Sequence, residues 1–220
     1  MHKVTLEDIN QQRKYSHIFF LLAIFTLSSC KKTEKAIIPD PSISNIVNIS
    51  GTDYPTVKIG TQTWTSLNYN GPGGNNYDNG PNEVMYGKLY SSEEANSVVT
   101  PAGWRLPSKA DFEKLLLELN GQTQLTGETL LSKDGTAKLM SISGWFQTQG
   151  NNKTGFNARP TGIGSLGGKG SVTEFWSSLK DGEYEWVMTM RGEYLDYNMN
   201  CSLSKTTKDW SRSIRFVKDN

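Results

Sequence analysis

The chain has 220 residues, and its 23 lysines and arginines nearly balance its 22 aspartates and glutamates. A near-neutral chain with no basic block lacks the electrostatic pattern of nucleic-acid binding, so we exclude nucleic acid as a partner. Both histidines, His2 and His17, lie near the N-terminus, which leaves the rest of the chain without an imidazole for a catalytic triad or a metal site.

Residues 1–29 are predicted to be a lipoprotein signal peptide. Three basic side chains precede the ten-residue apolar run IFFLLAIFTL, residues 18–27, which is too short for a membrane span of roughly 20 residues and suits a signal sequence. The run ends in Leu27-Ser28-Ser29-Cys30, which is similar to a bacterial lipobox, and we expect Cys30 to be lipidated. The alternatives are an ordinary signal peptide and an N-terminal anchor helix that happens to end in cysteine.

Residues 30–50 are expected to hold the lipidated Cys30 and a flexible tether. The stretch KKTEKAIIPDPSISN combines charges, two prolines and polar side chains with little periodicity. This composition is typical of a spacer that holds a domain away from a membrane. Residues 51–220 then number roughly 170, which suits one domain.

The first part of this domain is predicted to contain a hairpin, a loop and a short helix. Strands at 56–59 and 62–67 flank Gly60-Thr61, which indicates a hairpin. The segment 71–82, GPGGNNYDNGPN, reads as a loop because glycine, proline and asparagine dominate it. A second, shorter helix is predicted at 91–95.

The clearest local signal lies in Gly103-Trp104-Arg105-Leu106-Pro107-Ser108 and in the helix predicted at 109–119. Pro107 ends an extended segment, and Ser108 is a good N-cap. Asp111, three residues later, suits the helix N-terminus. One apolar stripe follows at helical spacing, formed by Phe112, Leu115, Leu116 and Leu119.

The remainder is predicted to be loops followed by strands. Residues 122–170 are polar and glycine-rich, and we expect long loops there. Strands are predicted at 175–179, 184–190 and 213–217. Helices in the middle and strands at both ends indicate an α+β domain with a mainly antiparallel sheet, one or two short helices and long loops.

Several ordered motifs together resemble the Fibrobacter succinogenes major paralogous (FISUMP) domain, which occurs in many surface lipoproteins. The resemblance covers about residues 51–219. It implies a fold distantly similar to the C-type-lectin-like fold shared with formylglycine-generating enzymes, and it places Trp64, Trp104 and Trp176 in the core. The motifs are 54–64, 86–90, 101–108, 154–160, 175–178 and 213–219.

The resemblance and the lipobox together imply a lipid-anchored protein of the outer membrane, with the membrane as its partner through the anchor. Surface-exported relatives often carry acidic residues after the cysteine, whereas this chain has Lys31 and Lys32. Both the surface and the periplasmic face of the membrane therefore stay open.

We do not expect catalysis. Formylglycine-generating chemistry needs redox-active cysteines, and lipidation of Cys30 would leave Cys201 alone, which we expect to be a partly buried structural residue. A carboxylate pair of the glycosidase kind would need Glu174 with Glu183 or Asp196, and nothing in their spacing favours it.

A binding function is expected instead, for polysaccharide or a surface protein, because loops on a stable sheet commonly carry recognition. Tyr77, Asp78 and Glu83, with the neighbouring asparagines 75, 76 and 79, are able to bind a sugar or calcium through oxygen atoms. No other cofactor is expected. Tyrosines that are candidates for stacking on sugar rings are Tyr69, Tyr77, Tyr194 and Tyr197. The alternative is a structural surface component without a small ligand.

Overall fold

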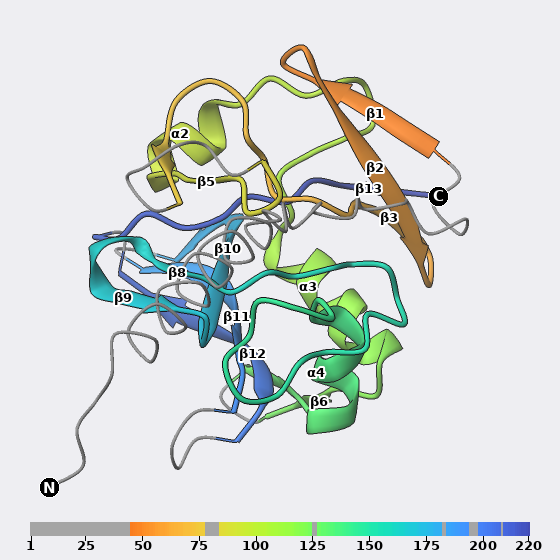
Figure 1. Ribbon diagram of the computed structural model, residues 1–220. Helices are drawn as coiled ribbons and strands as arrows, with labels where there is room; N and C mark the ends of the chain where they lie inside the picture. Colours follow the sequence, from red (N-terminus) through yellow and green to blue (C-terminus); the bar gives the residue numbers. More distant parts are fainter. Residues whose placement is uncertain (1–44, 78–83, 125–126, 182–183, 194–197, 208) are drawn as a thin grey trace, which may run out of the picture. The chain divides into compact units, whose positions relative to one another are not determined.

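The two ends of the described chain meet in one four-stranded sheet. The computed structural model describes residues 45–220 except 78–83, 125–126, 182–183, 194–197 and 208 (Figure 1). The sheet has the order β1-β2-β3-β13, and all three neighbouring pairs are antiparallel. Its strands are β1 (Asn45–Ile49), β2 (Thr52–Ile59), β3 (Gln62–Thr65) and β13 (Val217–Asp219).

The β2–β3 hairpin confirms the predicted turn, and β1 corrects the predicted tether. Ile59 pairs with Gln62 across Gly60, whose φ of +57° suits glycine. Residues 45–49 were expected to be flexible, yet they form a strand whose Val47 and Ile49 are buried. Alternating apolar side chains in NIVNI account for this, because one face of the strand covers the core.

A second sheet has seven strands, in the order β6-β7-β12-β11-β10-β8-β9. Long antiparallel strands occupy its centre, namely β10 (Val172–Asp181), β11 (Tyr184–Arg191) and β12 (Asn200–Thr206). The flanking strands are β6 (Gln122–Thr123), β7 (Thr129–Leu131), β8 (Thr161–Ile163) and β9 (Gly167–Lys169). β8 pairs with β10 in parallel, and every other strand pair named here is antiparallel.

The predicted helices are present, and both begin with a capping box. In α3 (Lys109–Glu118) the Ser108 hydroxyl accepts from the Asp111 amide, and the apolar stripe is buried as expected. In α2 (Ser92–Ser97) Ser91 and Glu94 form the same arrangement. A two-stranded ribbon, β4 (Asn75–Asn76) with β5 (Lys88–Leu89), precedes α2.

Regular structure between 122 and 170 was not predicted. This region contains β6 to β9, the helix α4 (Lys133–Leu139) and the short 3₁₀ turn η1 (Gly164–Leu166). Each element is too short to show a hydrophobic period, which explains the prediction of loops. The described residues thus hold three α-helices in an α+β domain with mainly antiparallel sheets.

The buried apolar side chains form two core clusters, and both contain tryptophan. Trp64 stacks on Phe112 with ring centroids 5.5 Å apart, and Trp176 is fully buried in the second cluster with Tyr90 and Phe216. These two tryptophans lie in the core as expected. Trp104 was also expected there, but it is only partly buried at the edge of the second cluster. Cys201 is completely buried in the first cluster, deeper than predicted.

The segment 212–217 runs through the interior instead of forming the predicted alternating strand. Its six side chains are all buried. Its backbone forms hydrogen bonds with several different segments. For example, Tyr69 N donates to Ile214 O at 3.0 Å, and Thr65 N donates to Phe216 O at 3.0 Å. A segment enclosed on both sides has no exposed face, so only its end, Val217, belongs to a regular strand.

Candidate functional site

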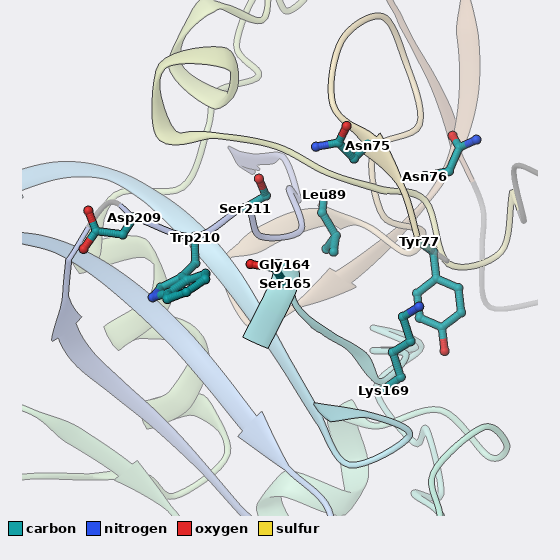
Figure 2. Close-up of a pocket in the computed structure, with 10 residues that line it drawn as sticks. All are labelled: Asn75, Asn76, Tyr77, Leu89, Gly164, Ser165, Lys169, Asp209, Trp210 and Ser211. Atoms are coloured by element: carbon teal, nitrogen blue, oxygen red, sulfur yellow. The ribbon is translucent and has the colours of Figure 1, made fainter. Parts of the chain in front are cut away.

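A surface pocket of about 230 Å³ lies where three loop regions meet. The β4 ribbon, the η1–β9 region and the segment after β12 each contribute side chains, and Leu89 of β5 completes the lining. Figure 2 shows Tyr77 and Lys169 at one end and Asp209 and Trp210 at the other. The lining consists of Asn75, Asn76, Tyr77, Leu89, Gly164, Ser165, Lys169, Asp209, Trp210 and Ser211.

The glycine-rich loop before β4 is held tightly, which fixes the two asparagines that follow. Lys88 Nζ donates to the Gly71 and Gly73 carbonyls at 3.0 and 3.1 Å. The Gly74 amide donates to Glu94 Oε1 at 2.9 Å, and this bond together with the one from the Ser91 amide lowers the pKa of Glu94. Gly74 has φ +63°, and a Cβ there would lie 2.7 Å from the Tyr90 ring, so only glycine fits.

The Trp210 side of the pocket is anchored to a buried ion pair. Arg212 Nη1 donates to the Trp210 carbonyl at 2.8 Å, while Arg212 Nε donates to Glu174 Oε2 at 2.5 Å. Gly164 packs against the neighbouring backbone, because a Cβ there would lie 3.1 Å from the Ser211 amide nitrogen. Core side chains therefore set the position of the segment that presents Asp209 and Trp210.

Tyr77 takes part in an aromatic stack at the other end. Its ring lies parallel to that of Tyr86, with centroids 4.2 Å apart and an interplanar angle of 9°. Lys169 Nζ lies 5.1 Å from the Tyr77 centroid, and the Arg159 guanidinium carbon lies 5.6 Å from the Tyr86 centroid. The Tyr77 ring is thus engaged by Tyr86 and Lys169, and we regard Trp210 as the pocket aromatic suited to stacking.

The structure places part of the predicted site in this pocket. Tyr77, Asn75 and Asn76 line it. Tyr69 is wrong as a stacking residue, because it is 2% exposed and packs between Tyr54, Tyr90 and Phe216. The predicted residues outside the described part of the chain are Cys30, Asp78, Asn79, Glu83, Glu183, Tyr194, Asp196 and Tyr197.

Sequence reasoning missed Lys169, Asp209, Trp210 and the η1 turn as parts of one site. Trp210 stands among polar residues in KDWSRS, but the buried Trp64 does so too in TQTWTS, so the sequence carried no signal that singles out Trp210. Nothing in the chain order indicates that residues 77 and 210 line the same pocket, because this follows from how distant segments are placed by the fold.

Glu174, one of the carboxylates considered for a glycosidase pair, lies in the core. Glu174 is occupied by Arg212 in the core and accepts from Thr189 Oγ1 at 3.0 Å, so it is wrong as a surface carboxylate of a glycosidase pair. Among the described residues no three side chains of the histidine, cysteine, aspartate and glutamate kinds gather to hold a metal. No helix in the described part is long and apolar enough to cross a bilayer.

Comparison with known proteins identifies the family. The model of the family described as the Fibrobacter succinogenes major domain matches residues 57–218. This range contains every strand of the seven-stranded sheet and the whole pocket lining. No curated protein and no solved structure matches the chain. The chain belongs to the Fibrobacter succinogenes major domain family.

Proposed function

We propose that this protein is a non-enzymatic lipoprotein of the cell envelope, whose domain binds a carbohydrate through the pocket between Tyr77 and Trp210. The observation that carries the proposal is the composition of the lining, in which one half-buried tryptophan occurs together with amide, hydroxyl and charged side chains. Apolar faces of sugars pack on indole rings, and sugar hydroxyls exchange hydrogen bonds with such polar groups.

The lining side chains suit one sugar ring whose apolar face packs on an indole and whose hydroxyl groups form hydrogen bonds. Trp210 supplies the stacking surface, Asp209 accepts from hydroxyls, and Asn75 and Asn76 are able to donate and accept. The volume of about 230 Å³ is below the roughly 300–1,000 Å³ of sites for drug-sized ligands. The pocket therefore fits one or two sugar units of a longer polymer.

A binding role is favoured over glycan cleavage by the single carboxylate among the lining residues. Glycosidases use two carboxylates on opposite sides of the scissile bond, whereas Asp209 is the one acid among the described residues that line this pocket. Calcium-assisted binding is included in the test below, because the carboxylates of Asp78 and Glu83 follow Tyr77 in the sequence.

The proposed location is the outer membrane, with Cys30 as the lipidated residue. The apolar run at 18–27 and the lipobox-like sequence that follows it support this location. Either membrane face is compatible with the sequence.

Binding of the full-length protein to a glycan array and to immobilised polysaccharides, with and without calcium, tests the function. We expect saturable binding that Trp210→Ala weakens by about ten-fold, the loss of one stacking contact. Tyr184→Ala is the matched control, since Tyr184 is an exposed aromatic of β11 outside the pocket. If no glycan or polysaccharide binds and the protein instead self-associates or binds a protein partner, the alternative of a structural surface component without a small ligand is favoured.

A further inference from the structure

The two charged side chains of the pocket lie at opposite ends of it. Among the described residues that line the pocket, Lys169 is the one cation and Asp209 the one anion. Figure 2 shows Lys169 beside Tyr77 at one end and Asp209 beside Trp210 at the other. The sugar-binding roles proposed above use the end with Trp210 and Asp209. A ligand that fills the whole pocket also meets the ammonium group of Lys169.

The backbone that carries Lys169 is held in place on both sides. Lys169 is the last residue of β9 and pairs with Thr161 of β8. Gly168 and Gly170 flank it with φ of +79° and +80°, values that favour glycine. Gly170 is buried under Phe146, whose ring a Cβ at this position would overlap, and its carbonyl accepts from the Phe146 amide at 2.8 Å. The side chain of Lys169 therefore starts from a fixed point at the pocket edge.

The ammonium group of Lys169 is positioned by an aromatic ring. Its Nζ lies 5.1 Å from the centroid of Tyr77, and the side chain runs toward this ring in Figure 2. Tyr77 is itself stacked on Tyr86, which keeps the ring in place. A ring face attracts a cation through its π-electrons, and an ammonium group brings three N–H donors and no acceptor. The contact thus fixes a hydrogen-bond donor with a positive charge at this end of the pocket.

A second cation adds to the positive charge at the same end. The guanidinium carbon of Arg159 lies 5.6 Å from the centroid of Tyr86, so each ring of the stacked pair has a cation near it. Charges of one sign that stand close together raise the local potential and attract an oppositely charged group. The acid of the lining, Asp209, lies at the far end. The end beside Tyr77 therefore favours an anionic group of the ligand.

We propose that the carbohydrate bound in this pocket is acidic, and that Lys169 binds the carboxylate of a hexuronate unit. The inference rests on the proposed function, because it names the class of sugar for the same pocket. A hydrogen bond from an ammonium to a carboxylate is roughly twice as strong as one between neutral groups. Asp209 repels a carboxylate, so the acid group is directed to Lys169 and the apolar sugar face to Trp210. Lys169 is thus the residue that selects acidic over neutral sugars.

A ligand pair that differs only in charge tests this selection. Trimers of galacturonate and of glucuronate are compared with their methyl esters, which keep the sugar rings and remove the negative charge. Titration calorimetry of the full-length protein measures each affinity. We expect at least one acid to bind about five- to ten-fold more tightly than its ester, and the difference to shrink as salt is raised. Esters that bind as tightly as the acids would overturn the inference.

Variants assign the selection to Lys169. Lys169→Gln should lower the affinity for the acid to that of the ester and leave the ester unchanged, which also shows that the variant is folded. Lys218→Gln is the matched control, because Lys218 is a half-buried lysine outside the lining whose Nζ lies 5.4 Å from the Trp104 centroid. It should alter neither affinity. An equal loss for acid and ester in Lys169→Gln would mean that Lys169 only shapes the pocket, and the inference would fail.

Reversal of the charge gives a stricter test. Lys169→Glu should bind the ester more tightly than the acid, because two carboxylates would then face each other. An unchanged preference for the acid would contradict the assignment.

The same measurements separate this inference from the proposed function. Trp210→Ala should weaken acid and ester alike, whereas Lys169→Gln weakens the acid alone. If neutral glycans bind through Trp210 and no acid binds better than its ester, the inference fails and the proposed function stands. If no glycan binds, both fail.

Discussion

Arg105 donates two hydrogen bonds to the carboxylate of Asp111, from Nη2 to Oδ1 at 2.6 Å and from Nε to Oδ2 at 3.2 Å. The same carboxylate accepts from Gln62 Nε2 of β3 at 3.0 Å and from the Ser108 amide at 2.8 Å. One buried acid thus joins the first sheet, the extended segment before α3 and the helix N-terminus. This clamp, defined by Arg105 and Asp111, holds the corner that leads into α3.

Removing the clamp should destabilise the domain. We expect Asp111→Ala to lower the free energy of unfolding by about 2–3 kcal/mol, because Gln62 is left buried with an unmet donor and the helix loses its capping box. Glu113→Ala, on the same helix, should cost no more than about 0.5 kcal/mol, since its pair with Lys109 at 2.5 Å is a partly exposed i,i+4 contact. Urea unfolding measures both, and equal losses would argue against the clamp.

The clamp also predicts how stability depends on acid. Burial raises the pKa of Asp111, but the hydrogen bonds from Arg105 and Ser108 outweigh it, so the pKa lies below its ordinary value. A carboxyl whose folded pKa is depressed stabilises the fold fully above its unfolded pKa, about 4, and loses this contribution as pH falls through the folded value.

The free energy of unfolding of Asp111→Asn should therefore differ most from that of the unchanged protein near neutral pH. The gap in unfolding free energy is expected to stay constant from pH 7 to about 5 and to narrow below pH 4. Urea titrations at several pH values measure it. A gap that is as wide at pH 2 as at pH 7 would mean that the charge of Asp111 contributes nothing.

Two tryptophans from the family motifs should differ in their contribution to stability. Trp176 is fully buried, donates from Nε1 to the Tyr90 carbonyl at 2.8 Å and has the Arg212 guanidinium 4.2 Å from its ring centroid. We expect Trp176→Ala to cost about 3–5 kcal/mol, the range for large core truncations. Trp104 is partly exposed, with Lys218 Nζ 5.4 Å from its ring centroid.

For Trp104→Ala we expect a smaller loss, about 1–2 kcal/mol, because part of the apolar area is already in contact with water. The position of Trp104 thus corrects the sequence-based expectation that it is a core anchor. Thermal unfolding of both variants gives the comparison. Equal shifts in melting temperature would show that Trp104 is buried more completely than its place in the fold indicates.

The lipid anchor can be tested at Cys30 independently of the domain. Labelled palmitate should be incorporated into the unchanged protein and lost from Cys30→Ala, which should also leave the membrane fraction. Cys201→Ala is a control for thiol-specific labelling, because burial raises the pKa of the Cys201 thiol and keeps it unreactive. Labelling that persists in Cys30→Ala would place the acyl group elsewhere.

Local structure was predictable where a short stretch carries its own physical signal. Ser108, Pro107 and Asp111 define the start of α3 through backbone restriction and hydrogen bonding within one turn. The same holds for Gly60 in the β2–β3 hairpin. By contrast α4 has only seven residues, and its Ser132 cap is not accompanied by an apolar stripe long enough to recognise.

The candidate site was predictable only in part, because only one of its segments carries a local signal in the sequence. A loop rich in asparagine and tyrosine indicated Tyr77, because such side chains are common in recognition loops. Asp209 and Trp210 lie more than a hundred residues away in the chain, and Lys169 looks like any other lysine in the sequence. What each of them contacts depends on packing that no local pattern encodes.

The sequence by itself therefore determined the class of the domain, its family, its caps and turns and the lack of histidine beyond residue 17. These properties depend on composition and on neighbours within a few residues. The tertiary structure alone decided that β1 begins at Asn45, that the segment 212–217 is enclosed, and that Tyr77 and Trp210 share a pocket. It also put the Lys169 ammonium group against the Tyr77 ring, because pairing across a fold is set by which distant elements pack together.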